Sequence, residues 1–309
     1  MAGKDIVTKK FINHNLYFAD ICNSFIYHGE QRVLPEQLHE LNIELPVYTE
    51  YDKINSERIN IKQEEPKRRD AVKYISAKAD DNAAYLIVGI EHQSSIDYTM
   101  PVRTMQYDAL QYIKQKQEIE TEHRTYNKNN RLLPVITIVL YFGNKPWDGP
   151  MSLHEMLQID NPDLLQYVAD YPLHLIDPHR MDEHALQQFQ TNAREVLTFI
   201  KHSKDGHKLL ELVQEPRFQS LDLLAAEVIN ECTNSHLPLN ITKGDDVNMC
   251  EGIEQIREDS RNEGRDERSK EMAAALIKKN IMSLAEIAEL TKLSIEEINQ
   301  LQHKQLQNV

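Results

Sequence analysis

Two carboxylates are spaced along the chain as ligands of a divalent metal ion would be. Asp70 stands at the start of one β-prone segment, and Glu91 stands at the end of the next. Antiparallel pairing of these segments, through a turn near Asp80, would bring both carboxylates to the same edge of a sheet. Carboxylate oxygens are hard ligands that suit Mg²⁺, with Mn²⁺ or Ca²⁺ as alternatives. The spacing therefore indicates metal-assisted phosphodiester hydrolysis, with a solvated acidic residue at each strand end as the alternative interpretation.

Gln93 is predicted to share the face of Glu91, because side chains two residues apart on a strand point the same way. Its amide can donate and accept hydrogen bonds, so it could orient a water molecule or a phosphate oxygen. An amide cannot serve as a general base. The nucleophile in such a site would be a water molecule activated by the metal.

The segments that must position these residues alternate between helix and strand. Apolar spacing and β-prone runs predict a helix at 15–27, a strand around Val72, a strand at 85–90, a helix at 101–118 and a strand at 132–142. This order describes a compact α/β core over residues 1–150, with a mixed central sheet flanked by helices.

The pattern becomes helical after the core. Residues 151–248 are predicted as a helical extension, 249–272 as a charged helix or linker, and 273–309 as a small tail of two short helices. The tail has two capping-box spacings, Ser283 with Glu286 and Ser294 with Glu297. The tail resembles a helix-turn-helix, but its second helix begins with two glutamates, which favours a packing or oligomerisation role over DNA reading.

Composition restricts the class of protein. The net charge of −14 over 309 residues disfavours long-range attraction to DNA, although local basic patches can still bind phosphate. The three cysteines are far apart and predict neither a disulfide framework nor a zinc knuckle. No leader and no apolar stretch approaching the ~20 residues of a membrane span is visible, so a cytoplasmic location without membrane contact is expected.

Several other chemistries lack their motifs. The sequence contains no HExxH, GxxxxGK[ST], GxGxxG or GxSxG pattern, and its histidines are scattered without metal-ligand spacing. These absences disfavour zinc proteases, P-loop nucleotide hydrolases, dinucleotide-dependent enzymes and serine hydrolases.

Longer blocks of sequence resemble one family. Arg69-Asp70, then Glu91-His92-Gln93-Ser94, then Met100-Pro101-Val102-Arg103 and Tyr107 are similar to the Rpn (YhgA-like) recombination-promoting nucleases of the PD-(D/E)xK superfamily. The apolar block 133–143, Trp147-Asp148-Gly149-Pro150, the opening segment 18–23 and the tail 283–301 extend this similarity over most of the chain. The resemblance implies a restriction-endonuclease-like core at 1–150, followed by an all-helical C-terminal region.

The family resemblance also implies site roles. Asp70 and Glu91 would bind Mg²⁺, and Gln93 stands where most of the superfamily has lysine. Replacing a lysine cation by a neutral amide weakens stabilisation of the charged phosphate, so a lower rate by the same chemistry is expected. Asp20 is a further candidate metal ligand from the first helix, with a solvated or capping role as its alternative.

Contacts with DNA are expected from residues beside these ligands. Arg103 and Tyr107 are four residues apart and so share a helix face, where they could hold a phosphate or simply support the helix on the sheet. Arg69 belongs to a basic run that could contact the DNA backbone.

The sequence supports two main hypotheses. The first is a Mg²⁺-dependent DNA endonuclease that promotes recombination. The second is a catalytically weak or inactive nuclease-fold protein that acts in DNA binding or protein assembly, favoured by the acidic charge and the missing lysine. A homo-oligomer formed through the charged helix or the C-terminal tail is a further hypothesis.

Overall fold

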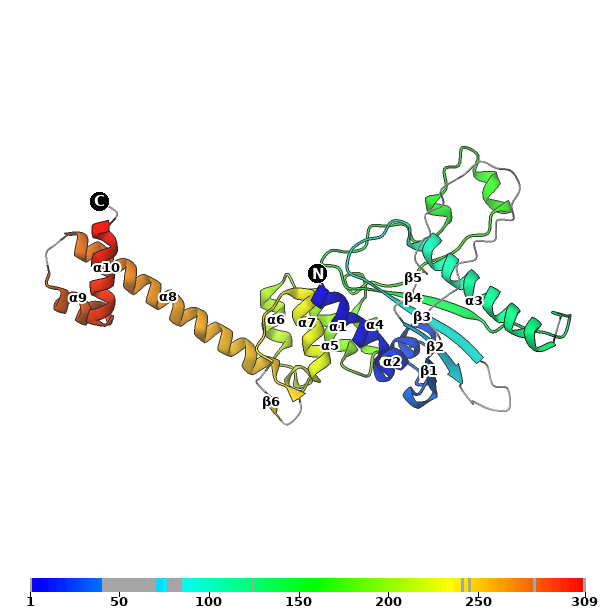
Figure 1. Cartoon of the computed structure of the whole chain (residues 1–309), viewed down its shortest axis with the longest axis horizontal. Coiled ribbons are helices and arrows are strands. Elements are labelled where there is room, and N and C mark those ends of the chain that lie inside the picture. The colour runs from blue at the N-terminus through cyan, green and yellow to red at the C-terminus, as the bar shows by residue number, and fades with distance from the viewer. Residues whose placement is uncertain are drawn as a thin grey trace. The chain divides into compact units, whose positions relative to one another are not determined.

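A five-stranded mixed sheet is the central feature of the computed structural model, which describes residues 2–40, 71–76, 85–123, 125–239, 242–243, 246–279 and 282–307. The strands follow the order β1-β2-β3-β4-β5 (Figure 1). Strands β1, β2 and β3 pair antiparallel, whereas β3, β4 and β5 pair parallel. The strands are β1 (Leu38–Glu40), β2 (Ala71–Ser76), β3 (Tyr85–Gln93), β4 (Val135–Tyr141) and β5 (His174–Ile176).

Continuous apolar sequence places β3 and β4 at the centre of the sheet. Val88, Ile90, Ile138 and Val139 are completely buried. Parallel strands of this kind are covered on both faces, so their sequences do not alternate between apolar and polar residues. The strands predicted at 85–90 and 132–142 are confirmed as β3 and β4. The predicted antiparallel pairing of the segment around Val72 with the segment 85–90 is also confirmed, as the β2–β3 pair.

Helices cover the two faces of the sheet. Helix α3 (Met100–His123) lies on one face, where the Thr137 hydroxyl of β4 donates to Asp108 Oδ1. Helices α1 (Ala2–Asn13) and α2 (Asn15–Ile26) lie on the other, where Lys73 Nζ of β2 donates to the carbonyl of Asn13 at 2.6 Å. The predicted helices at 15–27 and 101–118 correspond to α2 and α3, and α3 extends five residues further. Helix α1 was not predicted, because its apolar residues are few and weakly periodic.

A second helical layer follows the sheet in sequence. Helices α5 and α7 pack against each other, and α7 also packs against α1. The elements beyond the sheet are α4 (Glu183–Gln187), α5 (Ala193–His202), α6 (Gly206–Leu212) and α7 (Leu223–Thr233), with strands β6 (Thr242–Lys243) and β7 (Asp246–Val247). Short 3₁₀ turns occur at η1 (Pro35–Gln37), η2 (His154–Met156), η3 (Pro162–Tyr167) and η4 (Pro216–Gln219). Strand β5 was not predicted, because three residues show no periodicity.

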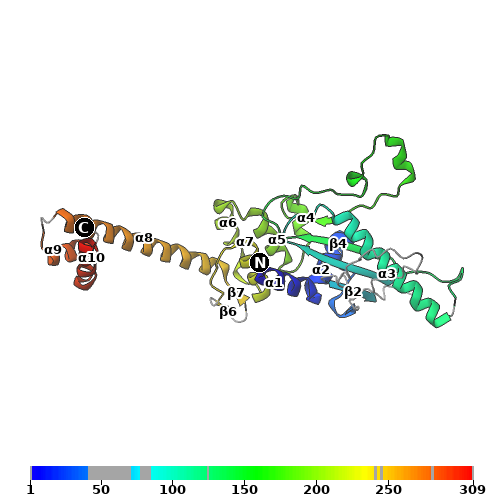
Figure 2. The ribbon, with the colours of Figure 1, turned by 45° about the horizontal axis from the view of Figure 1, so that its top comes forward.

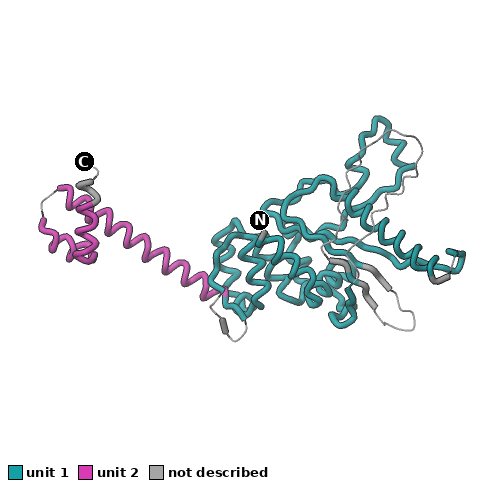
Figure 3. The backbone as a smooth tube through the Cα atoms, viewed as in Figure 1, with its two compact units in different colours: residues 1–248 teal, residues 249–309 magenta. Residues whose placement is uncertain are grey.

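The chain divides into two compact units, residues 1–248 and 249–309 (Figure 3). The second unit consists of α8 (Met249–Lys279), α9 (Leu284–Thr291) and α10 (Ile295–Gln307), which enclose a small core of Ala273, Ile287, Leu293 and Ile298. Together with the sheet, these elements make a mixed α/β fold with a helical C-terminal region. None of the helices in the described ranges combines the length and apolar composition that crossing a membrane requires.

Both predicted capping boxes of the tail are confirmed. Ser283 N donates to Glu286 Oε2 at 2.8 Å, and Glu286 N donates to Ser283 Oγ at 3.3 Å. Ser294 N and Glu297 form the same reciprocal pair at 2.9 and 3.2 Å. Each box satisfies backbone N–H groups that the first turn of a helix leaves unpaired.

Gly143 lies two residues beyond the end of β4, against the side chain of Tyr141. A Cβ atom at Gly143 would overlap the hydroxyl of Tyr141, whose side chain is 2% exposed and packs against Trp147. We expect Gly143→Ala to lower the free energy of unfolding by about 1–3 kcal/mol, because the added methyl group would displace the buried ring from its packing against Trp147. Urea unfolding would measure this change.

Gly206→Ala is the matched control for that variant. No atom lies within 4 Å of a Cβ at Gly206, and alanine favours the helix that begins there. Equal stability losses in the two variants would show that the Tyr141 contact is not responsible.

Candidate functional site

Glu91 lies near the end of β3, on the face of the sheet that α3 covers. Its side chain is completely buried, and Arg103 Nη2 of α3 donates to its Oε2 at 3.1 Å. A buried carboxylate is costly unless a cation or hydrogen-bond donors compensate for its lost hydration. Arg103 supplies that cation from the first turns of the helix.

Arg103 itself is held by three side chains. Besides Glu91, its Nη1 donates to Asp97 Oδ2 at 3.3 Å, and its Nε donates to the Tyr107 hydroxyl at 3.1 Å. Burial alone would lower the pKa of this guanidinium, but the Tyr107 hydrogen bond and the negative charges of Glu91 and Asp97 raise it, so the group stays charged. The structure thus brings together Glu91, Arg103 and Tyr107 of the predicted site residues. A phosphate-binding role for Arg103 stays a prediction.

Gln93 follows Glu91 on the same face of β3 and is 9% exposed. Its backbone carbonyl accepts from Phe142 N at 2.7 Å, and Tyr141 of β4 is its register partner. These contacts fix the backbone of Gln93 at the point where β3 and β4 both end. His92, between the two site residues, faces the opposite side, where its Nε2 lies 2.8 Å from Asp5 Oδ1 of α1.

Asp70, Arg69 and the turn near Asp80 lie outside the described residues. The last described pair of the β2–β3 ladder on that side is Ala71 with Ile90. Asp70 precedes Ala71 in sequence and Glu91 follows Ile90. The meeting of Asp70 with Glu91 therefore stays a prediction, made from the sequence and this register.

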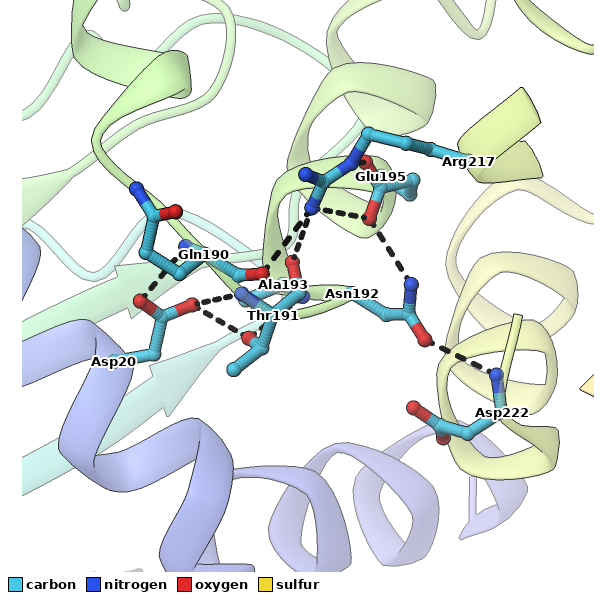
Figure 4. Close-up of polar contacts among 8 residues, drawn as sticks. All are labelled: Asp20, Gln190, Thr191, Asn192, Ala193, Glu195, Arg217 and Asp222. Atoms are coloured by element: carbon cyan, nitrogen blue, oxygen red, sulfur yellow. Dashed lines mark hydrogen bonds and ion pairs between the residues drawn. The ribbon is translucent and has the colours of Figure 1, made fainter. Parts of the chain in front are cut away.

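Asp20 is placed against the start of α5 (Figure 4). Its Oδ1 accepts from Gln190 N at 3.0 Å, and its Oδ2 accepts from Thr191 N at 2.9 Å and from the Thr191 hydroxyl at 2.5 Å. A carboxylate that binds N–H groups ahead of a helix is favoured by the partial positive charge there. These contacts are those of a capping residue, and a metal-binding role for Asp20 stays a prediction.

The network around Asp20 continues through polar groups that the sequence analysis did not identify. Glu195 of α5 is 1% exposed and accepts from Arg217 Nε at 2.5 Å (Figure 4). The Asn192 side chain donates to Glu195 Oε2 and accepts from Asp222 N. The contacts of Arg217 with Glu195 and of Asp222 with Asn192 join residues 22 and 30 positions apart in sequence, so no local pattern predicts them.

Asp97 is the residue near Glu91 that sequence analysis missed. Its Oδ1 accepts from Thr99 N at 2.8 Å and from the Thr99 hydroxyl at 2.6 Å, just before α3 begins. An aspartate two residues ahead of a threonine at a helix start is a local capping signal that could have revealed it. The next residue, Tyr98, donates from its hydroxyl to Asp148 at 2.9 Å and so joins this segment to the loop after β4.

The donor chemistry of the site suits a hard divalent cation only in part. Glu91 supplies a carboxylate and Gln93 an amide oxygen, both of which Mg²⁺ accepts. No group of three or more His, Cys, Asp or Glu side chains that could hold a metal occurs within the described ranges. Asp70, the second carboxylate of the predicted metal site, lies outside those ranges, so its role as a ligand stays a prediction.

The Glu91–Arg103 pair gives a testable stability prediction. We expect Arg103→Met to lower the free energy of unfolding by about 1–3 kcal/mol at pH 7, because it removes the cation from a buried carboxylate. The Arg103 side chain is 33% exposed, so solvent screening keeps the loss below that of a fully buried pair. In a Glu91→Gln background the same substitution should cost at least about 1 kcal/mol less.

Urea unfolding of the four proteins in this cycle measures the coupling. Tyr107→Phe is the control, because it removes one partner of Arg103 but keeps the cation beside Glu91. Additive losses from the Glu91 and Arg103 changes would contradict the ion-pair interpretation.

Asp97 gives a pH-dependent prediction. Burial alone would raise its pKa, but hydrogen bonds from Thr99 and the nearby Arg103 charge outweigh burial and lower it. Its stabilising contribution is therefore complete above the unfolded-state pKa of about 4 and is lost as the pH falls through the lower folded-state pKa. Asp97→Ala should cost about 1 kcal/mol at pH 7, and the difference from the parent should shrink below about pH 4. Urea unfolding at both pH values tests this, and a pH-independent difference would contradict it.

Comparison with known proteins identifies the group to which the chain belongs. Over 157 residues it is 25% identical to the recombination-promoting nuclease RpnC of Escherichia coli (strain K12), a match that covers 51% of this chain and 49% of the relative. The chain thus spans about half the length of that curated relative. No solved structure matches significantly.

A family profile described as "Putative transposase, YhgA-like" matches residues 64–226, more than half of the 309 residues. The matched region contains Asp70, Glu91, Gln93 and Arg103 and excludes Asp20. The family resemblance drawn from the sequence blocks is confirmed: the chain belongs to the YhgA-like family that this profile describes.

Proposed function

We propose that this protein is a Mg²⁺-dependent DNA endonuclease whose site is built on the end of β3. The observation that carries the proposal is Glu91, a completely buried carboxylate held by Arg103 beside the last described pair of the β2–β3 ladder. A protein seldom buries an acidic side chain at a strand end without a use for its charge. Asp70 would complete the carboxylate pair.

The family and its named relative support this proposal. The relative is called a recombination-promoting nuclease, and the matched segment of this chain contains the proposed ligands. DNA as substrate, recombination as the process served and Mg²⁺ as the metal are parts of the proposal that rest on this likeness and on the donor chemistry.

The arrangement of the first unit also supports a PD-(D/E)xK type of core. A mixed sheet has α3 on one face and α1 and α2 on the other, and the acidic residue lies on the α3 face. In this arrangement a β2–β3 antiparallel pair presents the ligands, and the parallel partner β4 keeps β3 rigid.

Each residue has a role in the proposed reaction. Bound Mg²⁺ would activate a water molecule and neutralise charge on the scissile phosphate. Asp70 and Glu91 would hold the ion, and Gln93 would orient the attacking water by a neutral hydrogen bond. Arg103 donates from Nη2 to Glu91 and from Nη1 to Asp97, so it could exchange one of these carboxylate contacts for a phosphate oxygen. Arg69 would contact the DNA backbone.

A weakly active nuclease-fold protein is the second candidate function. The ion pair between Arg103 and Glu91 favours this second candidate, because Arg103 would compete with a metal ion for the Oε2 atom of Glu91. The amide of Gln93 also provides less charge stabilisation than a lysine would. Such a protein would bind DNA or other proteins through the same fold.

Cleavage of supercoiled plasmid DNA tests the proposal. The parent protein should nick plasmid with Mg²⁺ or Mn²⁺ and not with EDTA. Asp70→Asn and Glu91→Gln should abolish nicking, and Gln93→Ala should slow it about a hundredfold, as loss of one preorganised hydrogen bond does. Asp5→Asn is the matched control, because Asp5 contacts His92 on the opposite face of the same strand.

Calorimetric titration with Ca²⁺ separates binding from catalysis. Binding that is lost in Glu91→Gln would support the metal site independently of turnover. Undiminished cleavage by the Asp70 and Glu91 variants would refute the assignment. A folded parent protein that neither binds metal nor cuts DNA would favour the second candidate.

A further inference from the structure

A small cavity opens beside β5, the strand at one edge of the sheet. Its walls come from the end of α2, from β5 and from the segment that contains α4. Helices α2 and α4 lie side by side in both views of the ribbon (Figures 1 and 2). The cavity has a volume of about 230 Å³. Most of its lining is apolar and includes Phe25, Leu175, Ile176, Met181 and Phe189.

The turn that ends α2 lies at the mouth of the cavity. His28 and Gly29 have positive φ angles of 52° and 91°, and Gly29 N donates to the carbonyl of Asn23 at 2.9 Å, which fixes the turn. A Cβ atom at Gly29 would lie 3.3 Å from Gln188 Cβ, so the turn packs closely against the end of α4. This packing holds the exposed His28 and the half-buried Gln188 at the mouth.

The floor of the cavity contains a hydroxyl group that lacks a hydrogen-bond partner. Ser24, Ile176 and Phe189 are the most buried of the lining residues, at 4%, 4% and 2% exposed. Ser24 Oγ makes no hydrogen bond to any residue that the structure describes. A buried hydroxyl without a partner destabilises a protein, because the hydrogen bonds that it made to water are not replaced. A molecule bound in the cavity could supply the missing hydrogen bond.

The lining indicates the chemistry of the ligand. None of the described residues that line the cavity is Asp, Glu, Lys or Arg, and His28 at the mouth is the one residue among them that titrates near neutral pH. A charged ligand would find no opposite charge there, so the lining favours a neutral one. An apolar cavity of about 150 Å³ holds a benzene molecule. The larger volume of this cavity therefore fits one aromatic ring with small substituents.

We propose that this cavity binds a small neutral aromatic molecule that carries one hydrogen-bonding group, such as a hydroxyl on a single ring. The ring would contact Phe25 and Phe189, and the hydroxyl would pair with Ser24. The Phe25 ring is already oriented by an edge contact with His174 of β5, at 5.7 Å between ring centroids. Because α2 covers the face of the sheet opposite Glu91, this site is separate from the proposed nuclease site and does not depend on nuclease function.

Titration of the full chain with p-cresol tests the site, with isotope-labelled methionine methyl groups as the magnetic-resonance reporters. The signal of Met181, assigned by comparison with Met181→Leu, should shift and saturate, whereas that of Met156, which does not line the cavity, should not move. Ala185 of α4 also lines the cavity, so Ala185→Trp should fill it and abolish the shift. Absence of a saturable Met181 shift in the parent, or its persistence in a folded Ala185→Trp protein, would overturn the proposal. Circular dichroism checks the fold.

Ser24→Ala tests the hydroxyl contact separately from the shape of the cavity. It should weaken p-cresol binding about three- to tenfold, as loss of one neutral hydrogen bond does, and leave binding of toluene, which has no hydroxyl, unchanged. Its melting temperature should not fall, because the Ser24 hydroxyl has no partner among the described residues. Ser260→Ala, at an exposed position of α8, is the matched control. Undiminished p-cresol affinity in Ser24→Ala, an equal loss of toluene affinity, or a lower melting temperature would each contradict the assignment.

Discussion

The ion pair between Glu91 and Arg103 ties the end of the central strand to the helix that covers it. A completely buried carboxylate is costly unless a cation or hydrogen-bond donors compensate for its lost hydration, so the Glu91–Arg103 pair couples the stability of β3 to that of the start of α3. Asp97 holds Arg103 from the connecting segment, and Tyr98 joins that segment to Asp148 beyond β4. The site, the helix start and the loop carrying Trp147 are therefore parts of one connected arrangement.

A second polar network fixes the helical layer to the sheet. Asp20 of α2 binds the backbone ahead of α5, and Tyr17 of the same helix donates to Asp222 at the start of α7. Burial and the carboxylates around it raise the pKa of the Tyr17 phenol, so the hydroxyl stays a donor at all physiological pH values. Because α2 also covers the sheet, helices α4 to α7 belong to the same compact unit as the proposed site.

Much of this architecture follows from sequence, and the exceptions have physical causes. The strands β3 and β4 and the helix α3 were predictable because long apolar runs and regular helical spacing leave few alternatives. The capping boxes of the tail were predictable because their partners are three residues apart. In the site, Glu91 and the Arg103–Tyr107 spacing were identified from the chain alone. Asp20 and Thr191 are 171 residues apart, and such a contact depends on tertiary folding that no local pattern encodes.

Two neighbouring residues at the end of β3 contact groups of opposite charge on the two faces of the sheet. Glu91 meets the guanidinium of Arg103 on one side, and His92 meets the carboxylate of Asp5 on the other. A slip of one residue along the strand would turn Glu91 toward Asp5 and His92 toward Arg103, so each face would set like charges or unmatched dipoles against each other. These charges therefore disfavour misaligned pairing of β3 during folding. Mutations that neutralise this end of β3 are expected to reduce the yield of correctly folded chain as well as the activity of the proposed site.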